Sequence, residues 1–195
     1  YPEIVNALGH AYVASGRVSD ARGVYRKAVE AFPQRPRFRL ELGRTFGFEK
    51  SWDDAIPIFE ELVRTSEDDP ELFLQVLFEL SRSYERAGHF ERSIRAFQRL
   101  LTLSPENHLA LNYLGYMLAE KGIRLKEAER LIERALRADP NNGAYLDSMG
   151  WVSYRQGQHR KAIEFLQRAL DIEEKSLQDQ GDGGLREDLA VIHDH

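Results

Sequence analysis

The sequence of 195 residues contains no cysteine, which excludes disulfide bonds and thiolate metal sites. It has no apolar run long enough to span a bilayer, so nothing in it predicts direct membrane insertion. A phosphate-binding loop is missing too, because Gly181-Asp182-Gly183-Gly184 is not followed by a lysine and a serine. The six histidines are dispersed, and no serine or histidine has the setting of a nucleophile. These absences predict a protein that is not an enzyme and uses no metal and no cofactor.

Acidic residues outnumber basic ones, and they gather at one end of the chain. The net charge of the whole sequence is -5. Residues 171–195 hold eight acidic and two basic residues, a net charge of -6, so the remaining residues sum to about +1. A general nucleic-acid binder usually carries a basic face and a high pI. The charge distribution therefore predicts that the partner is not nucleic acid.

Pairs of small residues recur once every 34 to 38 residues, and the two members of a pair lie twelve or thirteen positions apart. A glycine inside a helix costs about 1 kcal/mol relative to alanine, so its recurrence needs a structural reason. Close contact between two antiparallel helices supplies that reason, because a larger side chain would force the helices apart. Self-similarity at this period predicts a solenoid of helical hairpins. The pairs are Gly9/Ala21, Gly43/Ala55, Ser81/Ser93, Gly115/Ala128 and Gly150/Ala162.

The predicted fold class is all-α, a right-handed solenoid of antiparallel helix pairs with five repeats and the start of a sixth. A single array is expected over residues 1–176, and residues 177–195 are expected to form an acidic extension, a flexible loop and the first residues of an incomplete sixth repeat. The five repeats are placed at about residues 2–35, 36–69, 70–107, 108–142 and 143–176.

Local signals place several helix ends. Gly16 is expected to end the first helix in a left-handed conformation, and Ser19 to cap the second helix. Asp69 and Pro70 have the pattern of an N-cap followed by a proline in the first helical position, so the first helix of the third repeat is expected to begin near Pro70. Residues 173–180 are expected to extend the last helix.

The repeats share one pattern, which is complete in the first: Leu8-Gly9 and the aromatic Tyr12 are followed by Ala21, Tyr25, Ala28 and Pro33. This pattern resembles the tetratricopeptide repeat (TPR) family, and the resemblance covers about 90% of the chain. It implies a scaffold for protein–protein interaction. Repeats four and five, from Asn112 to Val152, are similar to the TPRs of bacterial envelope proteins, often lipoproteins. That similarity implies a location in the bacterial periplasm or at the outer membrane, and a cytoplasmic location is the alternative.

Stacked helix pairs place the first helix of each repeat on the concave side of the array. The face of that helix which does not pack on its partner carries the second, fifth, ninth, twelfth and thirteenth residues of the repeat, and resemblance to TPR peptide receptors implies the same positions. Arginines are expected in the middle of this surface and aromatic rings at one end, so an acidic peptide with an apolar part would be complementary. The candidate groove residues are Asn6, His10, Arg37, Arg44, Phe48, Phe78, Arg82, Arg86, Asn112, Tyr116, Asp147, Trp151 and Tyr154.

These residues also have structural interpretations. In one alternative, the arginines pair with Glu41, Glu79 and Glu85 and are ordinary charges on a solvated helix surface. In another, Trp151 and Tyr154 pack against the following repeat and belong to the core. The leading prediction for the function is the binding of a peptide or partner helix in the groove. The alternatives are a structural protein that forms homo-oligomers through its open repeat ends, and the docking arm of a larger enzyme.

Overall fold

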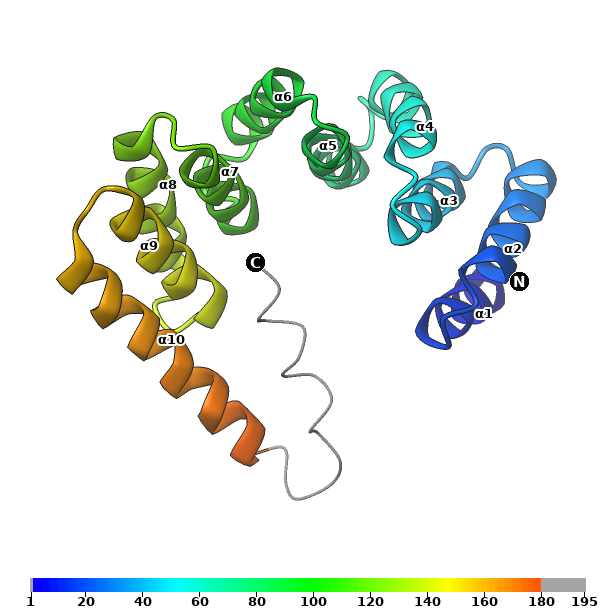
Figure 1. The fold of residues 1–195 in the computed structure, drawn as a ribbon. Coiled ribbons are helices and arrows are strands. Elements are labelled where there is room, and N and C mark those ends of the chain that lie inside the picture. Colours follow the sequence, from blue (N-terminus) through cyan, green and yellow to red (C-terminus); the bar gives the residue numbers. More distant parts are fainter. Residues whose placement is uncertain (1, 180–195) are drawn as a thin grey trace. The chain divides into compact units, whose positions relative to one another are not determined.

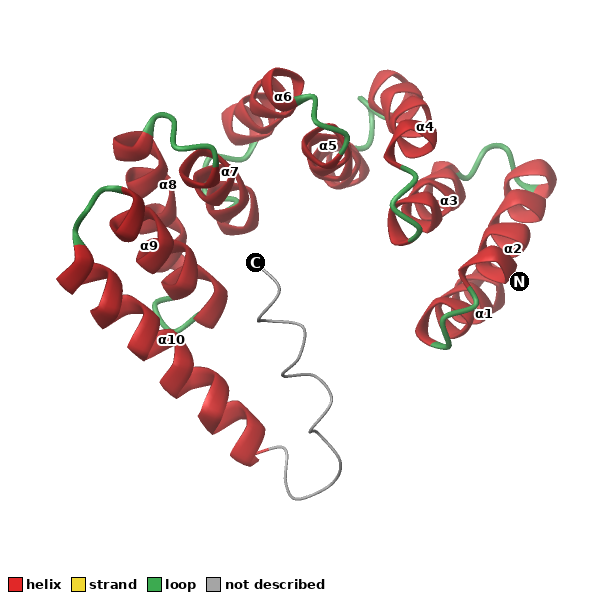
Figure 2. Cartoon of the chain, viewed as in Figure 1, coloured by secondary structure: helices red, strands yellow, loops and turns green. Residues whose placement is uncertain are grey.

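The computed structural model describes residues 2–179, which form ten α helices joined by short loops (Figure 1). Figure 2 shows helices and loops and no strand in this part of the chain. The helices are α1 Pro2–Ala14, α2 Val18–Ala31, α3 Pro36–Phe48, α4 Trp52–Thr65, α5 Pro70–Arg86, α6 Phe90–Leu103, α7 His108–Glu120, α8 Leu125–Ala138, α9 Gly143–Arg155 and α10 His159–Asp179.

The described residues form two compact units, with the boundary between Pro105 and Glu106. Helices α1 to α6 belong to the first unit and α7 to α10 to the second. Within the first unit each helix packs on the next one in the chain. In the second unit α7 packs on α8, α9 packs on α10, and α9 also contacts α7 and α8. The predicted start of a sixth repeat lies outside the described residues.

Several helix ends confirm the local signals in the sequence. Gly16 has a φ of +74°, and a side chain built there would meet no atom within 4 Å. The left-handed conformation, and not a lack of space, is therefore what the position requires. Helix α5 begins at Pro70, and the Asp69 side chain accepts a hydrogen bond from the amide of Leu72 at 3.0 Å. The prediction for Ser19 was wrong, because α2 begins at Val18 and the Arg17 carbonyl accepts from the amides of Asp20 and Ala21.

In four of the five helix pairs, the small residue of the first helix is a glycine that lies against a large side chain of the second helix. A Cβ built at Gly43 would lie 2.5 Å from Phe59 Cε1, and one built at Gly115 would lie 2.6 Å from Ile132 Cγ1 and 3.0 Å from the Ala128 carbonyl oxygen. The same relation joins Gly9 to Tyr25, and Gly150 to Leu166. In the third pair Ser93 Oγ donates a hydrogen bond to the Ser81 carbonyl at 2.8 Å.

This arrangement refines the sequence prediction. The second small residue of each pair is buried, as close helix contact requires. The group that most directly excludes a larger side chain, however, is the large residue four positions after it. Four of these large residues occupy the space that a Cβ on the first helix would need, because their partner on that helix is a glycine.

Substituting Gly43 by alanine is expected to destabilise the protein although alanine is the better helix former. The new Cβ would meet the Phe59 ring, which is 2% exposed and has little room to move. Overpacking costs roughly 1 to 3 kcal/mol, whereas the higher helix propensity of alanine contributes about 1 kcal/mol, so the net effect is destabilising. We expect the free energy of unfolding in urea to fall by about 1 kcal/mol.

Gly23→Ala is the matched control. Gly23 lies inside α2, and a Cβ there would meet no atom within 4 Å. This variant should gain about 0.5 to 1 kcal/mol from helix propensity. Equal stabilisation by both substitutions would show that the Gly43–Phe59 contact does not limit the packing of α3 and α4.

Candidate functional site

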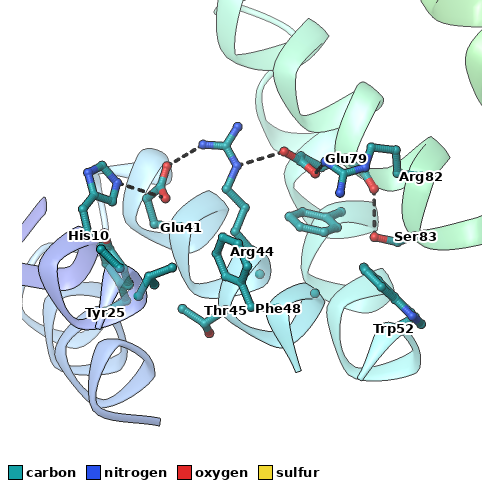
Figure 3. A pocket seen from close by; sticks show the side chains of 15 residues that line it. His10, Tyr25, Glu41, Arg44, Thr45, Phe48, Trp52, Glu79, Arg82 and Ser83 are labelled. Atoms are coloured by element: carbon teal, nitrogen blue, oxygen red, sulfur yellow. Dashed lines mark hydrogen bonds and ion pairs between the residues drawn. The ribbon is translucent and has the colours of Figure 1, made fainter. Parts of the chain in front are cut away.

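A cavity of about 450 Å³ opens in the first unit, with walls from α1 to α5 (Figure 3). One part of its lining is apolar and includes Val13, Ala14, Phe48 and Trp52. The polar part comes from three first helices, with His10 on α1, Glu41, Arg44 and Thr45 on α3, and Glu79, Arg82 and Ser83 on α5. Gly43 and Gly47 of α3 also belong to the lining, and the side chains of Phe59 and Trp52 pack against them.

Four of the residues predicted for the groove meet at this cavity. They are His10, Arg44, Phe48 and Arg82, contributed by the first, second and third helix pairs. Phe48 is 58% exposed, which is unusual for so large an apolar ring and makes it available for contact with a partner.

Charges of alternating sign cross the mouth of the cavity. Arg44 Nη1 donates to Glu41 at 2.7 Å and Arg44 Nε donates to Glu79 at 3.0 Å. Arg82 Nη1 lies 3.3 Å from Glu79, and His10 Nε2 lies 3.6 Å from Glu41 (Figure 3). The arginines of this cavity are therefore paired with Glu41 and Glu79, as the structural interpretation of the sequence proposed.

The pairing decides the electrostatic character of Arg44. Burial by itself would lower the pKa of its guanidinium, but the negative charges of Glu41 and Glu79 outweigh burial and raise the pKa. Two arginines and two glutamates balance one another at this site. The cavity therefore carries charged hydrogen-bonding groups without a large positive potential.

Tyr25 is the main residue of the site that the groove pattern did not include. Its side chain lines the cavity and is 1% exposed, yet its hydroxyl has no hydrogen-bond partner. Burial, with a smaller contribution from Glu41, raises the pKa of Tyr25 to about 12. Phe59 and Phe97 occupy the equivalent positions of the next two repeats. The tyrosine at this position of the first repeat was therefore the feature of the sequence that could have singled out Tyr25.

The other predicted residues of the first unit do not line this cavity. Arg37 pairs with Glu71 at 3.2 Å, and Arg86 lies 3.3 Å from Glu85. The Phe78 ring packs edge-on against Phe97, with 5.8 Å between the ring centres. Asn6 is partly buried, and its side-chain oxygen is buried without a hydrogen-bond partner.

In the second unit the predicted aromatic residues form a stack. The rings of Trp151 and Tyr154 lie 5.5 Å apart with an angle of 24° between them, and Tyr154 is 52% exposed. Asn112 has a buried side-chain oxygen without a partner, as Asn6 has at the same position of its repeat, and Trp151 Nε1 also lacks a partner. Tyr116 is half-buried on α7. Burial raises the pKa of Asp147, although its carboxyl group still meets solvent.

Two further findings concern residues 2–179. They contain no cluster of three or more histidine, aspartate or glutamate side chains able to hold a metal ion. In the same residues, no helix has both the length and the apolar character needed to cross a bilayer.

Known proteins share this repeat pattern. A family model described as tetratricopeptide repeat matches residues 6–70, 78–143 and 123–176. A TPR repeat-containing protein of Pseudomonas aeruginosa is 36% identical over 122 residues, which cover 63% of this chain and 19% of the relative. Lipopolysaccharide assembly protein B of Escherichia coli is 23% identical over 173 residues, or 84% of this chain and 43% of that protein. The chain thus spans less than half the length of these relatives.

The crystal structure of MamA is similar in fold. It superposes with a TM-score of 0.70 at 22% identity and covers 87% of this chain and 96% of that one. At this level of identity the likeness concerns the fold, the arrangement of the backbone in helix pairs.

Removing the hydroxyl of Tyr25 and that of Tyr84 should have different effects. Tyr84 Oη donates to Glu60 at 2.6 Å and accepts from Arg92 at 2.9 Å, whereas Tyr25 Oη has no partner. Tyr84→Phe is expected to lower the free energy of unfolding by about 1 to 2 kcal/mol, and Tyr25→Phe to leave it unchanged or raise it by up to about 1 kcal/mol. Urea unfolding at neutral pH measures both values.

The same pair gives a pH test. Burial, then the hydrogen bond to Glu60, raises the pKa of Tyr84 from 10 to about 12. Its contribution to stability is complete below pH 10 and is lost as the pH rises toward 12. In Tyr84→Phe the free energy of unfolding should therefore fall less between pH 10 and pH 12 than it does in the wild type.

The comparison at neutral pH has its own contrary outcome. If Tyr25→Phe lowered the free energy of unfolding as much as Tyr84→Phe does, the Tyr25 hydroxyl would be hydrogen-bonded in the folded protein.

Proposed function

The chain belongs to the tetratricopeptide repeat family, and we propose that it binds a peptide or partner helix at the cavity between α1, α3 and α5 of its first unit. Its fold is the all-α solenoid of antiparallel helix pairs, and TPR proteins generally act as scaffolds for protein–protein interaction. The fold is typically non-enzymatic, in keeping with a role in binding.

The observation that carries the proposal is a cavity that sets apolar and charged hydrogen-bonding groups side by side. Phe48, which is 58% exposed, and Trp52 provide apolar contact, and the guanidinium groups of Arg44 and Arg82 provide donors. The cavity is therefore suited to an amphipathic side chain with an apolar body and a polar tip.

Arg82 gives the partner a second contact. It donates to Glu79 through Nη1 at 3.3 Å, which leaves further N–H groups of its guanidinium for a carboxylate of the partner. Because Glu41 and Glu79 already balance the two arginines, we expect a preference for acidic peptides that is modest, set by hydrogen-bond geometry more than by net attraction.

Asn112, Tyr116, Asp147, Trp151 and Tyr154 are proposed as contacts for the same class of ligand in the second unit. The Trp151–Tyr154 stack supplies aromatic area for such a contact. We further propose, from the similarity to lipopolysaccharide assembly protein B, that the protein works at the bacterial cell envelope.

Blocking the cavity should abolish this function without disturbing the fold. Ala14 is exposed at the end of α1 and lines the cavity, so Ala14→Trp should fill it. Peptides selected on the wild-type chain from a random phage-displayed library serve as probes, with affinity measured by fluorescence polarisation. We expect the variant to bind them at least about tenfold more weakly, or about 1.4 kcal/mol.

Ala11→Trp is the matched control, because Ala11 is exposed on the same helix and does not line the cavity. It should leave the affinity within about twofold of wild type. Peptides that bind both variants as tightly as wild type would place the binding surface elsewhere on the chain.

Self-association is a second candidate function, favoured by one face of α10. Ile163, Leu166 and Leu170 lie at i, i+3 and i+7 and are 66%, 40% and 50% exposed. Sedimentation velocity of the wild-type chain at several concentrations should then show an average mass that rises with concentration. The Ile163→Glu/Leu170→Glu variant should stay monomeric, because it would bury charge in the contact. Equal masses for both proteins would remove this candidate.

A further inference from the structure

The first unit has a second concave surface, between α4 and α6, that shares no residue with the cavity described above. It encloses about 490 Å³ over a floor of Val63, Leu77 and Leu80. Four arginines line it, Arg64 from α4 and Arg92, Arg95 and Arg99 from α6. This surface is called the arginine groove below. Helix α5 separates it from the cavity, since Arg82 and Ser83 line the cavity while Leu80 and Tyr84 line the groove.

The positive charge of the arginine groove is only partly neutralised. Glu60 is the one acidic residue among the side chains that line it, and it accepts hydrogen bonds from Arg92 and Tyr84. Arg99 lies 3.6 Å from Glu67 and over the Phe73 ring at 4.9 Å from its centre.

Arg64 and Arg95 differ from the other two arginines. Both are exposed, and neither has an ion pair or hydrogen bond to any residue in the described part of the chain. The groove therefore holds two guanidinium groups with all their donors available.

This concentration of arginine is not a consequence of the repeat. The positions of α4 that correspond to Arg92, Arg95 and Arg99 of α6 are Asp54, Pro57 and Glu61. On α10 they are Lys161, Glu164 and Arg168, so a carboxylate interrupts the row. The structural requirements of a helix pair are met by all three sets, and only α6 carries a continuous row of cations. Packing alone gives no reason for that row.

We propose that the arginine groove binds an acidic amphipathic helix of a protein partner. Arg92, Arg95 and Arg99 are spaced i, i+3 and i+7 along α6 and so extend over about 10 Å of helix. Carboxylates on one face of a second helix repeat with the same spacing. A partner helix lying along α6 sets its acidic residues against these guanidinium groups, and Arg64 closes the opposite wall. Apolar residues beside the carboxylates meet the floor of the groove.

A helix fits this surface better than an anionic membrane or a nucleic acid. The arginines line the two walls of a groove with a carboxylate inside it, and a flat bilayer surface would reach the rim alone. The whole chain has a pI of about 5.7, which disfavours extended contact with a polyanion.

The test uses three probes with the full chain. The first is a fluorescein-labelled, alanine-based helical peptide with glutamates spaced i, i+3 and i+7 beside a stripe of leucine. The second has glutamine in place of each glutamate, and the third is a vesicle of phosphatidylcholine and phosphatidylserine. We expect the glutamate peptide to bind at least about tenfold more tightly than the glutamine peptide, and to weaken as salt is raised.

Arg64→Glu/Arg95→Glu is the decisive variant. These side chains have no partner to lose, so the fold should be retained, and the glutamate peptide should bind at least about tenfold more weakly. Arg26→Glu/Lys27→Glu on α2 makes the same change of charge at exposed positions away from the groove and should bind as wild type does. Circular dichroism checks the helix content of both.

Several results would overturn the proposal: equal affinity for the two peptides, no binding of either, an equal loss in both charge-reversal variants, or binding of the vesicles alone. Ala14→Trp, which blocks the separate cavity, should leave the glutamate peptide bound. A loss of binding in that variant would place the acidic helix at the cavity and not in the arginine groove.

Discussion

The helix pairs depend on a large side chain of the second helix that packs against a glycine of the first helix. Phe59 against Gly43 and Ile132 against Gly115 bring two backbones close enough that a single added Cβ would overlap. Because this contact fixes how the first helix is rotated, it also fixes which of its residues remain free on the other side. The cavity of the first unit follows from that rotation: His10 and Arg44 each lie one position after the glycine that makes the contact.

The residue that makes this contact varies, and the variation has chemical consequences. Phenylalanine, isoleucine or leucine fills the space with apolar atoms only. Tyr25 fills it and adds a hydroxyl, which is buried against Gly9 without a hydrogen-bond partner. The stability of the pair is set by the ring, while the hydroxyl costs free energy in the unbound protein.

The sequence predicted the period, the helix pairs and several helix ends, because glycine, proline and apolar spacing act locally along the chain. It did not decide between free and paired arginines. Arg44 reaches Glu79, thirty-five residues away, and that contact depends on how α3 and α5 pack. The prediction that Ser19 caps α2 was wrong for a related reason. A serine near a helix start indicates a cap in the sequence, but α2 begins before it, with the Arg17 carbonyl accepting the first hydrogen bonds and the Arg17 side chain paired with Asp20. The cavity itself needs the positions of five helices, which no periodicity supplies.

The two concave surfaces of the first unit differ in electrostatics more than in shape. At the cavity, Glu41 and Glu79 hold the arginines, so any anionic ligand must compete with carboxylates already in place. In the arginine groove, Arg64 and Arg95 have no such competitor and bind without breaking an ion pair. Helix α5 stands between them with Leu72, Val76 and Leu77 almost fully buried, and a helix anchored so firmly moves little when either side is occupied. The two surfaces should then bind their ligands independently. A partner that reaches both would gain affinity because its two binding segments are connected, and not because the fold changes.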